Sequence, residues 1–185
     1  MSADLVVDYR GYDATVVAFS GVAPLNHMFE WTRSCGDLPA NFVGVKDPLE
    51  CWYQRSVFAV MWRLRRLARP LIFIGGSAGG FAALWFGRMM GADKIVAFCP
   101  QSACGEAKRA LGDERWGEYC VRTPSRDIAG SYPQAVVHFA EDEPRDVMHA
   151  LRIDAERRSW PSGGHDLPYR MRESGRLQAA LREAL

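Results

Sequence analysis

Residues 71–80 read Leu-Ile-Phe-Ile-Gly-Gly-Ser-Ala-Gly-Gly. The four apolar residues predict a buried strand, and the apolar segment 81–86 that follows the glycines predicts a buried helix. A serine held between a strand and a helix sits on a sharp, strained turn, so the residues two before it and two after it must be small. Gly75 and Gly79 meet this demand around Ser77. The stretch therefore predicts a nucleophile elbow, a turn that presents a serine hydroxyl at the end of a strand.

A glycine-rich turn between a strand and a helix can also bind phosphate. The dinucleotide fingerprint G-x-G-x-x-G does not fit, because counting from Gly75 or from Gly76 places Ser77 or Ala78 at the second glycine. A Walker loop ends in a lysine followed by serine or threonine, and this stretch contains no lysine. We therefore predict no nucleotide cofactor.

Strand-like and helix-like segments alternate along the 185 residues, which predicts a mostly parallel α/β sheet in a single domain spanning 1–185. Strands are expected at 5–7, 15–19, 41–45, 71–74, 94–98 and 135–139, with a weaker edge strand at 156–160. The short turn at 11–13 favours a hairpin, so the first strand is expected antiparallel to the second. Helices are expected at 56–69, with four arginines on the polar face, and at the C-terminus. Segment 103–131 predicts short helices above the sheet, and the length leaves little room for a lid.

Composition and cysteine usage narrow the partners and the compartment. The net charge of +1 favours neither nucleic acid nor an anionic membrane as a partner. Five scattered cysteines without C-x-x-C spacing suit a reducing cytosol and fit neither a disulfide framework nor a metal site; Cys99 is expected in the core. Residues 1–4 lack the features of a signal peptide, and no apolar run approaches membrane-spanning length. We expect a cytoplasmic protein of undetermined oligomeric state.

A histidine is needed to activate the serine, since a hydroxyl is a poor nucleophile until its proton is removed. At a nucleophile elbow the order along the chain is serine, acid, histidine. His27 precedes the serine, His138 lies in an apolar strand and is expected in the core, and His149 is expected to face solvent or the adjoining loop. His165 follows the flexible loop 161–164, between the last strand and the C-terminal helix. It is the predicted base.

The acid that orients this histidine is expected just after the strand at 135–139. Asp146 is favoured, with Asp142 and Glu143 as alternatives closer to the end of the strand. A carboxylate at a helix start also caps backbone amides, so Asp146 has a purely structural alternative role.

The oxyanion hole should use two backbone amides. One is the amide of Ala78, the residue after the nucleophile, and the other comes from the loop after an early strand. In that loop we favour the amide of Val22, with Gly21 as the alternative.

The elbow, segment 98–102 and the residues Gly163-Gly164-His165-Asp166 together resemble the α/β-hydrolase superfamily, and more narrowly its small, lidless bacterial members. Segments 19–21 and 46–53 are similar as well, so the resemblance spans most of the chain. It implies an α/β-hydrolase fold with Ser77 as nucleophile, His165 as base and an acid near Asp146. One departure is Cys99, where a serine is expected before the proline.

The expected function is that of a serine hydrolase that cleaves a carboxylic ester or thioester through an acyl-enzyme on Ser77. One alternative is an acyltransferase that passes the acyl group to an alcohol, sugar or amine. The other is a non-catalytic binding module on the same fold. Without a lid, the site suits a small-molecule or a polymer-borne acyl substrate. Trp52, Tyr53 and Trp116 are candidates for its apolar walls, although aromatic residues are more commonly buried in the core.

Overall fold

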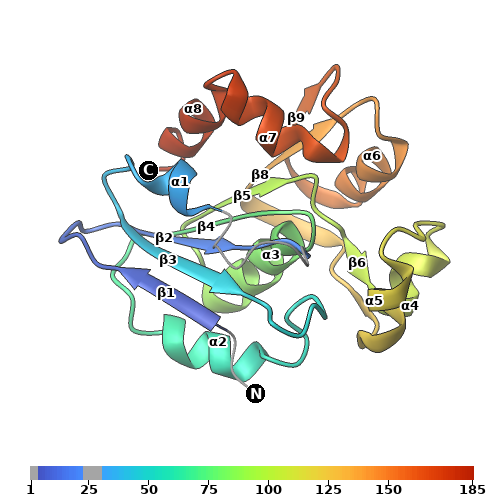
Figure 1. Ribbon diagram of the computed structural model, residues 1–185, viewed down its shortest axis with the longest axis horizontal. Coiled ribbons are helices and arrows are strands. Elements are labelled where there is room, and N and C mark those ends of the chain that lie inside the picture. Colours follow the sequence, from blue (N-terminus) through green and yellow to red (C-terminus); the bar gives the residue numbers. More distant parts are fainter. Residues whose placement is uncertain (1–3, 23–30) are drawn as a thin grey trace.

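The computed structural model describes residues 4–22 and 31–185. Among these residues, seven strands form a central sheet in the order β1-β3-β2-β4-β5-β8-β9 (Figure 1). The strands are β1 (Asp4–Asp8), β2 (Thr15–Phe19), β3 (Asn41–Lys46), β4 (Leu71–Gly76), β5 (Lys94–Phe98), β8 (Gly130–Ala140) and β9 (Ile153–Trp160). Every neighbouring pair is parallel except β1 and β3. The mostly parallel sheet and the edge position of the last strand are confirmed.

The pairing of the first strand differs from the predicted hairpin. β1 is antiparallel, as expected, but it pairs with β3, and Asp8 lies opposite Phe42. Both sides of β2 are occupied by its parallel neighbours β3 and β4. The connection from β1 to β2 instead passes the start of β3, where the Asn41 side chain accepts hydrogen bonds from the backbone amides of Arg10 (2.9 Å) and Tyr12 (3.2 Å). This anchor carries the chain past β3 before β2 begins.

Helices cover both faces of the sheet. They are α1 (Thr32–Cys35), α2 (Val57–Leu64), α3 (Ala78–Met90), α6 (Pro144–Leu151), α7 (Leu167–Glu173) and α8 (Arg176–Arg182). Figure 1 shows α1, α7 and α8 on one side of the sheet and α2 and α3 on the other. The side chains of β2 alternate accordingly: Val17 and Phe19 pack with α3, whereas Val16 and Ala18 pack in the cluster that includes α7 and α8. Burial on both faces explains why the strands read as continuous apolar runs.

Two expected helical segments are changed in detail. The helix expected at 56–69 ends at Leu64, where a bond from the amide of Leu67 to the Leu64 carbonyl tightens the chain into a turn. Segment 103–131 contains the expected short helices, α4 (Gly105–Ala110) and α5 (Gly117–Arg122). It also contains β6 (Ala103–Cys104) and β7 (Arg126–Asp127), an antiparallel pair too short to leave a periodic signal. Figure 1 shows this group beyond the end of the sheet to which β3 points.

The turn after β4 has the strained geometry that the glycines predicted. Ser77 adopts a φ of 54° and a ψ of −120° at the start of α3. A Cβ atom at Gly75 would lie 2.2 Å from the Gly79 carbonyl oxygen, and one at Gly79 would lie 2.2 Å from the Phe19 carbonyl oxygen. At Gly80 a Cβ would meet the Pro100 backbone at 3.0 Å. The helix therefore sits against the sheet with no room for side chains at these positions.

We expect Gly79→Ala to destabilise the fold by about 3 kcal/mol or more, because the new methyl group overlaps rigid strand backbone. The midpoint and slope of urea unfolding measure the loss. Gly117→Ala is the matched control, since no atom lies within 4 Å of its added Cβ. Equal stability of Gly79→Ala and the wild type would show that the turn is packed less tightly than described.

Of the helices in the described part of the chain, none combines the length and the apolar character needed to cross a bilayer.

Candidate active site

The structure brings together the three side chains that the sequence singled out. Ser77 lies at the end of β4, His165 in a short 3-10 helix (Gly164–Asp166) before α7, and Asp146 in the first turn of α6. The Ser77 Oγ lies 2.8 Å from the His165 Nε2, and the His165 Nδ1 lies 2.9 and 3.0 Å from the two carboxylate oxygens of Asp146. Because the three residues follow parallel strands, they meet at the carboxyl edge of the sheet. The result is a continuous chain of hydrogen bonds from hydroxyl to carboxylate.

The two alternative acids bond to other groups. The Asp142 carboxylate accepts hydrogen bonds from the amides of Gly163 (3.1 Å) and Gly164 (2.9 Å), which lower the pKa of its carboxyl. Glu143 caps α6 by accepting from the amide of Arg145 and pairs with the Arg145 guanidinium at 2.7 Å. Asp142 therefore holds the loop that carries the histidine, and Glu143 stabilises the start of α6.

Asp146 is fully buried, yet its surroundings favour the charged form. Burial works to raise the pKa of its carboxyl, but the hydrogen bond and charge of His165, together with the Arg115 guanidinium, outweigh burial and hold the pKa below its usual value. The Nη1 of Arg115 lies 2.8 Å from Asp146 Oδ1 and 3.3 Å from His165 Nδ1. Asp146 is thus an ionised acceptor that fixes the imidazole with its Nδ1 proton toward the carboxylate and its Nε2 toward Ser77.

Arg115 belongs to a buried polar cluster that sequence reasoning did not anticipate. Its guanidinium forms a forked pair with Asp113, with Nη2–Oδ2 at 2.7 Å and Nε–Oδ1 at 2.9 Å. Asp113 also contacts the Lys108 Nζ at 3.1 Å and the His149 Nε2 at 3.1 Å. Burial opposes the charge on Asp113, but the bonds from His149 and Arg115 dominate and lower the pKa of its carboxyl.

The position of His149 corrects the expectation that it faces solvent or a loop. Its side chain is fully buried, and its Nδ1 accepts a hydrogen bond from the amide of Ser102 at 3.1 Å. The reason is helical geometry: His149 follows Asp146 by three residues on α6, so both project from the same face. This three-residue spacing could have indicated the burial of His149, because Asp146, if it orients the catalytic histidine, must lie on the inward face of the helix.

Gln101 is a second neighbour of Ser77 that the sequence did not reveal. Its Nε2 donates to the Ser77 Oγ at 3.4 Å, and its Oε1 accepts from the Trp52 indole at 2.6 Å. An indole N–H is only a donor, so it fixes which end of the Gln101 amide faces the serine. The serine oxygen therefore accepts from Gln101 while its proton points toward His165. Trp52 and Tyr53 are both core residues.

A cavity of about 150 Å³ opens beside Ser77. It is lined by Gly21, Val22, Gly76, Ser77, Trp116, His165, Asp166, Pro168 and Tyr169. Of the aromatic residues considered as walls, Trp116 lies here. The predicted loop residues Gly21 and Val22 also face the cavity, and Ala78 is buried as the first residue of α3. His27 lies outside the described residues.

Cys99 shares the site with Asp146 and His165. Among the described residues, one potential ligand atom from each of these three lies within 4.8 Å of the others. Burial raises the pKa of the Cys99 thiol well above its usual value, and the charge of Asp146 adds to that effect. The Arg115 guanidinium already compensates Asp146 at 2.8 Å. A metal ion needs a deprotonated thiol, and the positive charge of Arg115 beside Asp146 would repel it. Cys99 is therefore better described as a small core residue beside the hydrogen-bonded pair of His165 and Asp146.

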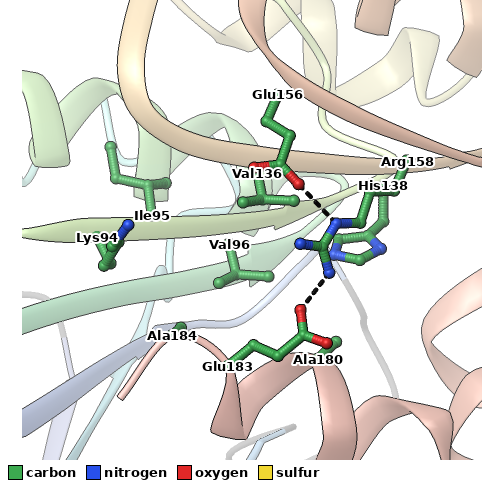
Figure 2. A pocket seen from close by; sticks show the side chains of 10 residues that line it. All are labelled: Lys94, Ile95, Val96, Val136, His138, Glu156, Arg158, Ala180, Glu183 and Ala184. Atoms are coloured by element: carbon green, nitrogen blue, oxygen red, sulfur yellow. Dashed lines mark hydrogen bonds and ion pairs between the residues drawn. The ribbon is translucent and has the colours of Figure 1, made fainter.

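A second cavity of about 130 Å³ lies between the end of α8 and strands β5, β8 and β9 (Figure 2). Figure 2 shows Arg158 between Glu156 and Glu183, with which it forms ion pairs. His138 lines this cavity and is a core histidine, as expected: it is 1% exposed and its ring stacks on Phe98 at 4.8 Å. Its Nδ1 accepts from the Trp160 indole at 3.3 Å. Burial, aided by the charge of Arg158, lowers the pKa of His138 to about 4.

His138 should make the fold sensitive to acid. Between pH 6.5, the ordinary pKa of histidine, and pH 4, the approximate pKa of His138 in the folded protein, the unfolded chain binds a proton that the folded chain does not. Stability is therefore lost as pH falls through this window, by about 3 kcal/mol at most. We expect His138→Phe to flatten that part of the profile, measured by urea unfolding from pH 7 to pH 4. Parallel profiles for the variant and the wild type would contradict the assignment.

Comparisons with known proteins identify the fold. No protein-family model matches the chain, and no curated protein matches its sequence. Among solved structures, the capsule O-acetyltransferase of Neisseria meningitidis serogroup A superposes with a TM-score of 0.68 at 12% identity, over 98% of this chain and 92% of that one. A thermophilic esterase from Thermogutta terrifontis gives 0.64 at 15% identity, over 98% and 92%. An α/β serine hydrolase without a lid from Xanthomonas campestris gives 0.60 at 16%, over 99% and 89%. The protein thus has the α/β-hydrolase fold.

Proposed function

We propose that the protein is a serine hydrolase that cleaves a carboxylic ester or thioester through an acyl-enzyme on Ser77. The observation that carries the proposal is the hydrogen-bonded chain from Ser77 Oγ through His165 to Asp146, with links of 2.8 and 2.9 Å. The esterase and the serine hydrolase among the structures of similar fold support the same reaction class.

In the first half of the reaction, Ser77 Oγ attacks the acyl carbonyl carbon while His165 Nε2 accepts the hydroxyl proton. Asp146 stabilises the imidazolium that forms, through the bond at Nδ1. The oxyanion is placed against the amides of Ala78 and Val22, one at the start of α3 and one in the loop lining the cavity. Collapse of the tetrahedral intermediate breaks the bond to the leaving group, which takes the proton from His165.

In the second half, water attacks the acyl-enzyme carbonyl and gives a proton to His165. The acid leaves, and the proton returns to the Ser77 oxygen. The Gln101 amide contributes to both halves, since its bond to Oγ keeps the serine aligned with the imidazole. The cavity of about 150 Å³ beside Ser77 would hold the acyl group of a small-molecule or polymer-borne substrate.

A second candidate function is acyl transfer, in which an alcohol, sugar or amine replaces water. The observation that favours it is the superposition on a capsule O-acetyltransferase with a TM-score of 0.68 over nearly the whole of both chains. The chemistry up to the acyl-enzyme is the same, so the acceptor alone separates the two functions.

Turnover of a panel of short- and long-chain aryl esters, acyl-CoA and acetylated sugars tests the proposal. We expect release of the carboxylic acid from at least one acyl donor. Repeating the reaction with added glycerol, hexoses or amines and weighing the products by mass spectrometry separates hydrolysis from transfer. A folded protein that binds these compounds without turning any of them over would favour the binding-module alternative.

A further inference from the structure

The Arg115 guanidinium lies against the histidine–carboxylate pair, where a serine hydrolase needs no cation. It reaches Asp146 Oδ1 at 2.8 Å and comes within 3.3 Å of His165 Nδ1. The Nδ1 of His165 donates its proton to Asp146, whose oxygens lie at 2.9 and 3.0 Å. The N–H of Arg115 near Nδ1 therefore faces another donor and forms no hydrogen bond with it. Arg115 therefore binds the carboxylate and repels any additional positive charge on the ring.

Arg115 is held in this position by buried ion pairs and hydrogen bonds. Its forked pair with Asp113 fixes the plane of the guanidinium, and its side chain is only 13% exposed. Asp113 is fully buried, and its carboxylate contacts Lys108 and His149 at 3.1 Å. The Lys108 Nζ also donates to the carbonyl of Arg115 itself. An arginine anchored from behind in this way holds one position while the imidazole gains and loses its proton.

We propose that Arg115 is a positioning residue that acts through Asp146: it fixes the carboxylate on His165 Nδ1 and weakens the hold of the pair on an extra proton. This inference rests on the proposed function. Its consequence is that the fixed charge of Arg115 opposes an added proton on the imidazole, while Nε2 stays aligned with the Ser77 hydroxyl.

The other groups that face His165 are unchanged by a substitution at position 115. Ser77 faces Nε2 from the turn after β4, and the Cys99 thiol, which burial keeps protonated, contacts the Gly164 carbonyl at 3.7 Å. Asp142 bonds the amides beside the ring from the end of β8, and Asp166 is its neighbour in the chain. Glu143 lies 4.0 Å from the Arg115 guanidinium and loses that contact in both neutral variants, so the comparison of these variants with Arg115→Lys isolates the charge at position 115.

The test is a ¹⁵N NMR titration of the His165 ring, assigned with His165→Gln, in the wild type and three variants. Arg115→Met and Arg115→Gln remove the charge, and the glutamine keeps a donor for Asp146. We expect the His165 midpoint to rise by about one pH unit in both. Arg115→Lys keeps the charge and should leave the midpoint near that of the wild type. Near-UV circular dichroism shows whether each variant is folded. If one neutral variant misfolds, the other still provides the test.

The acidic limb of serine labelling by a fluorophosphonate should move to higher pH in the same two variants, since labelling needs neutral His165. If Arg115 had a purely structural role, labelling would fall in all three variants, and the midpoints of the neutral variants would not differ from that of Arg115→Lys. Equal NMR midpoints in the wild type and a folded neutral variant would overturn the inference even where Ser77 is labelled. Shifted midpoints in a protein whose Ser77 is never labelled would instead sink the proposed hydrolase function.

Discussion

We expect Ser77→Ala to lower ester turnover by about a hundred-thousandfold or more, a larger loss than that of any other substitution described here. Alanine removes the oxygen that would form the proposed acyl-enzyme, while the fold should be retained. Ser77 is partly exposed, and its side chain makes only the bonds to His165 and Gln101 among the contacts described. The measurement is kcat/KM for the best donor of the ester panel, beside an unfolding curve.

Ser174→Ala is the matched control for this loss. Ser174 is an exposed serine at the end of α7, and its hydroxyl bonds helix carbonyls. We expect its turnover to equal that of the wild type. Retained turnover in Ser77→Ala, with the folded state intact, would show that another group carries the chemistry.

Asp146→Asn should reduce turnover by about a hundredfold to ten-thousandfold. The amide is nearly the same size as the carboxylate but can present its NH₂ group to His165, and it removes the charge that stabilises the imidazolium. It also leaves Arg115 with one fewer anion, since Asp146 lies 2.8 Å from that guanidinium. The loss should appear mainly in kcat, because Asp146 is fully buried and does not line the cavity beside Ser77.

Asp142→Asn and Glu143→Gln separate the acid from its neighbours. Glu143→Gln should leave turnover within about threefold of the wild type, because Glu143 caps α6 and pairs with Arg145, and its only link toward the site is a 4.0 Å ion pair with Arg115 among the contacts described. Asp142→Asn should cost about tenfold at most, since its oxygens hold the amides of the histidine loop. If Asp142→Asn or Glu143→Gln cost more than Asp146→Asn, the assignment of the acid would be wrong.

The elbow could be predicted because its requirements are local. The close approach of Gly75 to Gly79 involves residues four apart, and the small size of these residues is visible in the sequence. His165 could be singled out from its place between the last strand and the helices that close the chain. Asp146 could only be favoured over Asp142 and Glu143, because which carboxylate points toward the imidazole depends on where α6 begins.

The remaining features depend on contacts between distant segments. Asn41 decides the path from β1 to β2 across about thirty residues, so the local turn at 11–13 suggested the wrong partner strand. Arg115 meets Asp146 from 31 residues away and His165 from 50, and no spacing in the sequence relates them. Gln101 is oriented by Trp52, which lies 49 residues earlier. The Arg115 contacts follow from where the segment between α4 and α5 lies in the fold, which periodicity does not determine.

The central claim is that Ser77 is a nucleophile activated by His165. Treatment with a fluorophosphonate probe, followed by digestion and mass spectrometry, tests it most directly. The account predicts a single modified peptide containing Ser77 in the wild type, with the label lost in Ser77→Ala and strongly reduced in His165→Gln. A folded wild type that takes up no label, or takes it up at another residue, would contradict the account.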